Sequence, residues 1–192
     1  MANTNAPFGF LPVRRLSGKD IALRKVKKEA STIIGIGDPV VHTGSAEAGT
    51  GIALVDRAVG SEGTPGTITG IVVGIDPLRS DLTKQYYAAA DTGYLLIAVA
   101  DSDLVCEIQE DSVGGALAVT DVGQGFQMIV TNANTTTGRS KVMLDSSTGT
   151  TTTSSSQMMV LGKSQRPNYT IGNYCVFEVT FTRPTIDTQV LL

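Results

Sequence analysis

The sequence of 192 residues lacks tryptophan and has one histidine and two cysteines, and these shortages exclude several kinds of site. Cys106 and Cys175 lie far apart and form no CxxC spacing, which excludes a disulfide scaffold and a cysteine-based zinc site. The lone histidine, His42, has no second imidazole with which to share a metal ion. Aromatic residues make up only 5% of the chain, so no platform for base stacking is visible. We expect no metal ion and no other cofactor.

Long apolar runs and targeting signals are also lacking. No apolar run reaches about 18 residues, and the chain does not open with a charged segment followed by a short apolar one. We therefore expect neither a membrane span nor secretion through a signal peptide. Apolar residues still make up 41% of the chain, which is enough for a buried core.

No combination of residues matches a catalytic motif. The "LGKS" at 161–164 resembles the end of a phosphate-binding loop, but Gln157 stands where that motif requires glycine. His42 is accompanied by no serine or cysteine motif that a general base would activate. Asp101 and Asp103 have a spacing found in calcium loops, but the rest of an EF-hand is missing, and an acidic strand end is the preferred interpretation. We expect a protein that is not an enzyme.

The net charge of −3 is unevenly distributed along the chain. Residues 1–30 hold seven of the 15 basic residues and two of the 18 acidic ones, which gives them a charge of +5 and leaves −8 for the remainder. A basic segment on an acidic body is typical of a protein that docks onto a negative surface. That surface could be nucleic acid, an acidic protein or a second copy of the chain, and a solvated basic face is the alternative.

The opening segment, "MANTNAPFGFLPVRRLSG", contains Pro7, Gly9, Pro12 and Gly18, a spacing that favours neither a helix nor a long strand. The segment is nevertheless too apolar to be left in water. We predict an extended basic arm over residues 1–28 that attaches to a surface, its own or a partner's, and an ordinary N-terminal strand with a turn is the alternative. The candidate interface residues are Phe8, Phe10, Arg14, Arg15, Arg24, Lys25, Lys27 and Lys28.

The body, residues 29–192, contains many short strand-like segments. Apolar runs such as "GIALVDRAVG" and "GTITGIVVGIDPL" are bounded by glycine, aspartate, proline or threonine. "NYCVFEVTFTRP" gives the clearest alternation, with Cys175, Phe177, Val179 and Phe181 on one face. No segment is long enough, with the right apolar period, to predict a helix. The sequence therefore predicts a mainly β fold, an antiparallel small barrel or sandwich, with an extended N-terminal arm.

The segment "LVCEIQED" alternates for part of its length. Leu104, Cys106 and Ile108 fall on one face, while Glu107 and Gln109 fall on the other. We expect the second face to be wet or to meet a polar partner.

A low-complexity run interrupts the second half of the chain, where every residue from 146 to 156 is serine, threonine or glycine. Strand-like segments flank it, "RSKVMLD" before and "QMMVLG" after, and the residues that follow are too few for an independent core. We interpret the run as a connection between two strands of one sheet system, itself partly extended because threonine favours β-structure. The body could be one barrel or two subdomains, over about 29–100 and 101–192.

Three segments carry a resemblance to a known group of proteins: "NAPFGFLPVRRLSG", "DSDLVCEIQEDS" and "TTGRSKVMLDSST…MMVLGKSQRPNYTIGNY". In their general character and in their order along the chain, these segments resemble tailed-bacteriophage virion proteins, the capsid decoration or cement proteins encoded beside the major capsid protein. The resemblance implies a tulip-like or jelly-roll-like β fold on the outer face of the virion, made in the host cytoplasm. It implies the major capsid protein and further copies of the chain, as a dimer or trimer, as partners, with no direct contact to nucleic acid or membrane.

Two other functions remain open. One is another virion β-module, such as a head–tail or tail component. The other is a small glycan- or receptor-binding β-domain, which would need exposed aromatic residues beside carboxylates. The residues that could supply the aromatic groups are Tyr86, Tyr87, Tyr94, Tyr169 and Tyr174.

Overall fold

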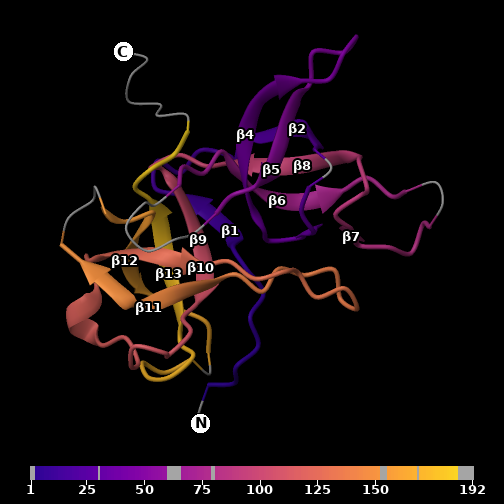
Figure 1. Cartoon of the computed structure of the whole chain (residues 1–192). Coiled ribbons are helices and arrows are strands. Elements are labelled where there is room, and N and C mark those ends of the chain that lie inside the picture. The colour runs from indigo at the N-terminus through magenta and orange to yellow at the C-terminus, as the bar shows by residue number, and fades with distance from the viewer. Residues whose placement is uncertain are drawn as a thin grey trace.

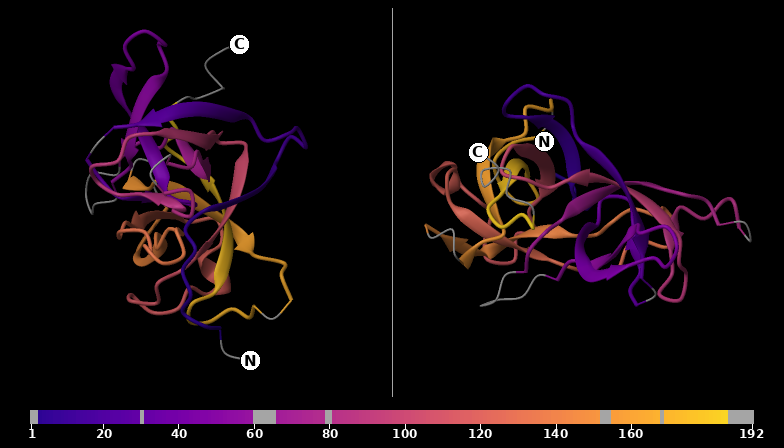
Figure 2. Two further views of the ribbon diagram at one scale, coloured as in Figure 1. Left: turned by 90° about the vertical axis from the view of Figure 1, so that its right-hand side faces the viewer. Right: turned by 90° about the horizontal axis from the view of Figure 1, so that it is seen from above.

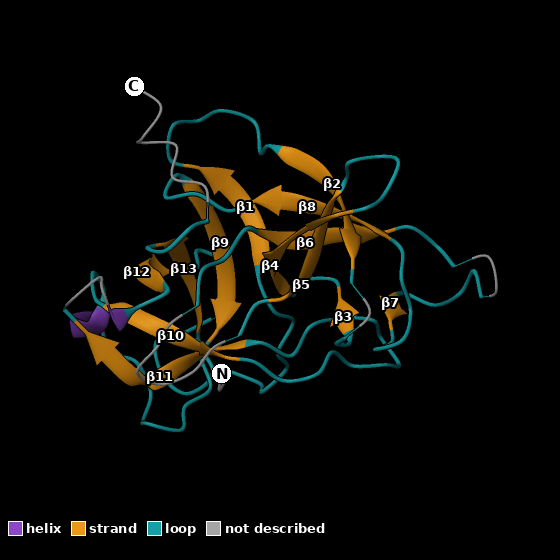
Figure 3. Ribbon diagram, turned by 45° about the horizontal axis from the view of Figure 1, so that its top comes forward, coloured by secondary structure: helices purple, strands orange, loops and turns teal. Residues whose placement is uncertain are grey.

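The computed structural model of the chain is built almost entirely of β-strands (Figure 1). It describes residues 3–29, 31–59, 66–78, 81–151, 155–167 and 169–185. The described residues include one short 3-10 turn with defined bounds, η1 (Val119–Asp121), drawn in purple in Figure 3. The strands form an open six-stranded sheet, a closed barrel and a separate pair. The expected mainly β fold with a small barrel is confirmed.

The open sheet is antiparallel throughout and has the strand order β1-β9-β13-β12-β10-β11. It combines the start of the chain with its second half, because β1 lies at one edge and all the other strands follow residue 103. The strands are β1 (Leu11–Arg15), β9 (Leu104–Gln109), β10 (Gly125–Ile129), β11 (Met143–Thr150), β12 (Met158–Lys163) and β13 (Val176–Phe181).

The barrel closes in the order β2-β5-β4-β6-β8. Four of its pairings are antiparallel, but β2 and β5 run parallel, so the barrel is mixed rather than purely antiparallel as expected. A short antiparallel pair, β3 (Ile34–Gly35) and β7 (Tyr86–Tyr87), lies outside it. The barrel strands are β2 (Leu23–Lys28), β4 (Pro39–Ala46), β5 (Ala53–Arg57), β6 (Gly70–Ile75) and β8 (Tyr94–Val99).

One apolar core joins the sheet to the barrel. Successive residues of a strand point to opposite faces, so Ile97 of β8 lies in the barrel interior while Ala98 points outward. Ala98 belongs to the same buried cluster as Cys106 and Phe177 of the sheet. The clear alternation expected around Phe177 is confirmed, since this face of β13 is buried in the shared core.

The first 28 residues do not form an arm outside the body. Strand β1 pairs with β9, and strand β2 pairs with β5 and β8, so the segment crosses from the sheet to the barrel, as the indigo ribbon shows in both views of Figure 2. Pro12 is tolerated inside β1 because an edge strand has a ladder on one side only. The strand-with-a-turn alternative describes the segment better than the arm.

Phe10 anchors this segment to the core. Its side chain is only 2% exposed, and its ring centroid lies 5.4 Å from that of Phe181. Its backbone N–H donates a hydrogen bond of 2.9 Å to the carbonyl of Gly37. Phe10 is thus part of the chain's own interior and is not available as an anchor on a partner.

The low-complexity run connects β11 to β12, as expected. Both strands pair with β10, so the run joins two strands of one sheet, and β11 itself extends through Ser146–Thr150. Residues 152–154 of the run lie outside the described ranges. The prediction of a partly extended loop within one sheet is confirmed.

Gly9 is required where the N-terminal segment meets the turn before β4. It has φ +74°, and a Cβ at this position would lie 2.6 Å from the carbonyl oxygen of Gly37 and against the side chain of Ser140. Both the backbone conformation and the lack of space favour glycine. Gly18 has a similar φ of +71°, but its Cβ would meet nothing within 4 Å.

We predict that Gly9→Ala lowers the free energy of unfolding by about 3 kcal/mol or more, because it adds a steric clash to the conformational strain. The control, Gly18→Ala, should cost only about 1–2 kcal/mol, since it introduces the strain alone. Denaturant-induced unfolding of the two variants measures both losses. Equal losses would contradict the close packing of the N-terminal segment.

Candidate functional site

Arg15 is held inside the molecule by two carboxylates at the start of β9. Its guanidinium bonds Asp101, and its Nε lies 3.0 Å from Oδ2 of Asp103. Asp101 is 2% exposed and also accepts the backbone N–H of Leu104 at 2.8 Å. Hydrogen bonds from the hydroxyl and N–H of Ser17, followed by Arg15, hold the pKa of Asp103 below its usual range. These aspartates form an acidic strand end whose charge is partly neutralised by the chain's own arginine.

Arg14 points to the opposite side and is exposed. Its side chain retains 49% of its accessible surface, and its guanidinium donates a hydrogen bond of 2.6 Å to Oε2 of Glu178. The two neighbouring arginines, both candidate interface residues, therefore have different environments. Arg15 belongs to a buried network, whereas Arg14 forms a surface ion pair.

We predict that Arg15→Met lowers the free energy of unfolding by about 3 kcal/mol, because it leaves the buried carboxylate of Asp101 without its countercharge. Arg14→Met removes the same charge and preserves the same apolar stem, but it should cost less than about 1 kcal/mol. Chemical denaturation of the two variants provides the comparison. Losses of similar size would show that burial of the Arg15 network contributes little.

The polar face of β9 meets the chain itself. Glu107 is 5% exposed, accepts a hydrogen bond of 2.6 Å from the hydroxyl of Ser164 and forms an ion pair with Arg166. Phe8 covers this pair, with its ring centroid 6.0 Å from the guanidinium carbon of Arg166. The aromatic ring expected to reach a partner instead packs over an intramolecular ion pair.

Gln109 continues this face and ties down the first residues of the chain. Its amide nitrogen donates to the carbonyls of Thr4 (2.9 Å) and Tyr174 (3.0 Å), and its amide oxygen accepts the N–H of Ala6 at 3.0 Å. Gln109 is 1% exposed. The polar partner expected for this face is therefore the N-terminal segment together with the loop before β13.

Lys28 is buried at the end of β2. It is 0% exposed, and its ammonium donates to the carbonyls of Glu29 (2.9 Å), Ala89 (3.1 Å) and Asp91 (3.0 Å). Burial lowers the pKa of this ammonium. Lys28 thus fastens β2 to the loop before β8 and presents no charge to a partner.

Lys27 pairs with Glu47 across the barrel surface. Hydrogen bonds lower the pKa of the Glu47 carboxyl to about 2. The largest contribution comes from Lys27, followed by the hydroxyls of Thr50 and Tyr94. The Tyr94 hydroxyl lies 2.9 Å from Oε2 of Glu47. The charge of Lys27 is therefore largely neutralised by a neighbour on the same face.

An exposed group of residues remains on β2 and β8, which we call the β2 strip: Leu23, Lys25 and Leu96 on the outer face of the barrel, and Arg24, exposed on the alternate side of β2. Leu23 is 55% exposed and Leu96 is 39% exposed. Leu96 is left uncovered because its partner in β6 is Gly74, which has no side chain. Within the described part of the chain Arg24 has no ion-pair partner, while the ammonium of Lys25 lies 3.6 Å from the exposed Asp76 and 4.1 Å from the ring centroid of Tyr94. Of the eight candidate residues, Arg24 and Lys25 are the most available.

A buried carboxylate lies at the corner that leads into β4. Asp38 is 0% exposed and accepts the backbone N–H of Gly35 at 2.7 Å. Burial raises its pKa from 3.8 to about 6, partly offset by hydrogen bonds from Ser140 and Gly35 and by the charge of Arg57. The native state therefore binds a proton that the unfolded chain releases at lower pH, and stability falls as the pH rises from about 4 to about 6.

We predict that Asp38→Asn stabilises the protein above pH 6 by up to about 3 kcal/mol, because the amide has no charge to desolvate. The gain should shrink towards pH 4, where the native carboxyl is protonated. Thermal unfolding from pH 4 to pH 8 measures the effect, with the exposed Asp20→Asn as control. A gain that does not change with pH would contradict the assignment.

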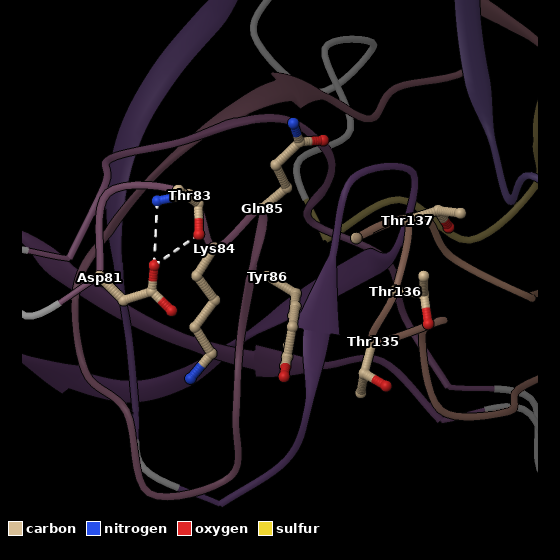
Figure 4. Close-up of a pocket in the computed structure, with 9 residues that line it drawn as sticks. Asp81, Thr83, Lys84, Gln85, Tyr86, Thr135, Thr136 and Thr137 are labelled. Atoms are coloured by element: carbon tan, nitrogen blue, oxygen red, sulfur yellow. Dashed lines mark hydrogen bonds between the residues drawn. The ribbon is translucent and has the colours of Figure 1, made fainter.

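A polar cavity of about 450 Å³ lies between the loop that leads into β7 and the turn that precedes Ser140 (Figure 4). Its walls come from parts of the chain about 50 residues apart, and no sequence pattern joins them. The only indication of this cavity in the sequence was that Tyr86 is one of the tyrosines considered for glycan binding. The lining residues are Asp81, Thr83, Lys84, Gln85, Tyr86, Thr135, Thr136, Thr137 and Gly138.

The remaining candidates from the sequence have ordinary structural positions. Cys106 and Cys175 are free and buried, and burial raises the pKa of both thiols. His42 lies in β4 and is half-buried. In the part of the chain that the structure describes, no three histidine, cysteine or acidic side chains are grouped as metal ligands. The described residues also include no helix of sufficient length and apolarity to span a bilayer.

Comparisons of the chain with protein-family models, with curated proteins and with solved structures found no match. Function is therefore argued from two features of the surface. They are the β2 strip on the barrel and the polar cavity beside β7.

Proposed function

We propose that this chain is a structural virion protein that binds the outer surface of a bacteriophage capsid and stabilises contacts between neighbouring capsomers. The observation that carries the proposal is the β2 strip, which exposes two leucines and two basic residues on a closed barrel. The resemblance of the N-terminal, central and later segments to capsid decoration proteins supports the same function.

The barrel gives the strip a fixed shape. Strand β2 pairs with β8 over Leu23–Lys27 and with β5 at Lys27 and Lys28. Buried Lys28 fastens β2 to the loop before β8, and the shared core limits movement of the barrel against the sheet. A surface that is already ordered loses little entropy when it binds, so more of the contact energy appears as affinity. Such a body suits a protein that must resist deformation of a shell.

The chemistry of the strip favours an acidic surface with apolar patches as its partner. Leu23 and Leu96 offer area for burial, while Arg24 can form a bidentate pair with a carboxylate. We propose the major capsid protein as this partner. Neighbouring copies of the chain, as a dimer or trimer, would add contacts, because the sequence beyond residue 30 has a charge of −8. Many copies on one particle make weak individual contacts effective.

The structure changes how the proposal should be tested. Deleting residues 1–15 would remove β1 and Phe10 from the fold, so the truncated chain would report on stability rather than on attachment. Substitution of exposed residues on the β2 strip avoids this problem, because in the described part of the chain Arg24 has no ion pair and the two partners of Lys25, Asp76 and Tyr94, are not fully buried.

We predict that the double variant Arg24→Glu/Lys25→Glu binds capsid particles prepared without this protein at least about tenfold more weakly, since two attractive charges become repulsive. The salt dependence of binding should also weaken. Cosedimentation at two ionic strengths measures both effects.

The matched control is Arg139→Glu/Lys141→Glu, which makes the same change of charge at two exposed positions away from the strip. It should bind like the unsubstituted protein. Equal affinity of the strip variant and the control would exclude the strip as the docking surface. Electron cryomicroscopy of the virion tests the location itself, and density for this chain anywhere but on the outer shell would contradict the proposed function.

A further inference from the structure

We infer that the polar cavity beside β7 is a binding site for an uncharged saccharide, which lies between the ring of Tyr86 and the threonines at 135–137. The cavity shares no residue with the β2 strip, so this inference does not depend on capsid binding. Its volume of about 450 Å³ falls within the range of small-molecule sites.

Tyr86 forms one wall. It belongs to β7, where it pairs with Gly35, and the ammonium of Lys84 lies 4.9 Å from its ring centroid. Lys84 is itself held by Asp91 at 2.6 Å. In Figure 4 the Tyr86 side chain stands between Lys84 on one side and the three threonines on the other. One side of the ring is thus supported, and the other is turned towards the cavity.

The threonines form the opposite wall, and a tight turn holds them. The side-chain oxygen of Asn134 accepts the backbone N–H groups of Thr136 (2.9 Å) and Thr137 (3.3 Å), and its carbonyl accepts the N–H of Gly138 at 2.7 Å. These bonds satisfy the backbone of the turn. Among the described residues the hydroxyls of Thr135 and Thr136 have no hydrogen-bond partner, so they can serve a ligand.

The two walls are locked together at their base. Gly138 has φ +68°, and a Cβ on it would collide with the backbone and side chain of Gln85. A Cβ on Gly35, the partner of Tyr86, would lie 2.5 Å from the carbonyl oxygen of Gly138. The backbone N–H of Ile36 donates to that same carbonyl at 2.8 Å. The width of the slot is therefore set by backbone contacts and not by mobile side chains.

The charges around the cavity favour an uncharged ligand. The ammonium of Lys84 is already paired with Asp91. Asp81 accepts the N–H (3.0 Å) and the hydroxyl (2.7 Å) of Thr83 through Oδ1, and these bonds lower its pKa, so it stays a carboxylate. With Lys84 and Asp91 neutralising each other, the carboxylate of Asp81 leaves the lining with a negative charge that would repel an anionic ligand.

A saccharide matches the remaining chemistry of the lining. Its ring has an apolar C–H face that can pack on an aromatic ring, and its edges carry hydroxyl groups that both donate and accept. Asp81 and the amide of Gln85 can accept hydrogen bonds from such hydroxyls, while the threonine hydroxyls can donate or accept. Neighbouring sugar hydroxyls can share one carboxylate, because a carboxylate accepts about four hydrogen bonds.

The test uses the full chain and the methyl glycosides of glucose, galactose, mannose and N-acetylglucosamine as probes. Saturation-transfer NMR detects binding, and titration calorimetry gives the affinity. We expect at least one glycoside to bind with a dissociation constant of about 1 mM or lower. Binding of this modest strength is what a single small ligand in an open slot can reach. Glucuronic acid, which adds a negative charge, should bind more weakly than methyl glucoside.

Variants locate the site. Tyr86→Ala should weaken binding about tenfold or more, while Tyr86→Phe keeps the ring and should retain most of the affinity. Thr136→Val, which preserves shape and removes a hydroxyl, should weaken binding about threefold to tenfold. The matched control is Tyr169→Ala, at a half-buried tyrosine that does not line the cavity.

Three results would overturn the inference. The first is the absence of saturable binding by all four glycosides. The second is affinity that survives both Tyr86→Ala and Thr136→Val in folded variants. The third is tighter binding of glucuronic acid than of methyl glucoside. Loss of capsid attachment in the β2-strip variant with unchanged sugar binding would separate the two functions.

Discussion

Phe10 packs against Phe181 in the core that the sheet shares with the barrel, and the backbone beside it lies directly against the turn at Gly37. Because of this contact the first segment of the chain runs through both parts of the molecule, as an edge strand of the sheet and then as a wall of the barrel. The contact needs glycine on both sides of the junction, since a Cβ on Gly9 would meet Gly37 and one on Gly37 would meet the carbonyl of Phe8. A segment fixed in this way cannot also extend from the body to hold a neighbour.

The fixed course of the first segment also determines which carboxylates its basic residues meet. Once β1 and β2 are placed, Arg15 faces Asp101, Arg14 faces Glu178 and Lys27 faces Glu47. The uneven charge of the sequence is thus partly neutralised within one molecule, at pairs that are far apart in the chain. What remains for a partner is the part of β2 that none of these carboxylates reaches, around Arg24 and Lys25. Attachment by a strand built into a barrel differs physically from attachment by a flexible arm, because the strand has already lost its conformational entropy on folding.

Local pattern was enough to predict the strands and the loop between β11 and β12. Alternation reports which residues share a face, so the apolar face of β13 around Phe177 could be read directly. It does not report what covers a face. Glu107 and Gln109 were recognised as a polar face, but their partners, Arg166 and the first residues of the chain, lie some 60 to 100 residues away. Strand pairing is non-local in this fold, and register and neighbours depend on contacts that no short window of sequence contains.

The polar cavity shows how far the effect of the shared core extends. Tyr86 follows the barrel strand β6 in the chain, whereas the turn at Thr135–Gly138 leads from β10 to β11 of the sheet. A slot between them keeps a constant width only if barrel and sheet keep a constant relation, and the core around Phe10 provides that relation. The backbone contact of Gly138 with Gln85 then sets the spacing locally. Weakening the junction at Gly9 would therefore alter the geometry of the cavity without changing any residue that lines it, which makes the cavity a sensitive reporter of how the two parts are held together.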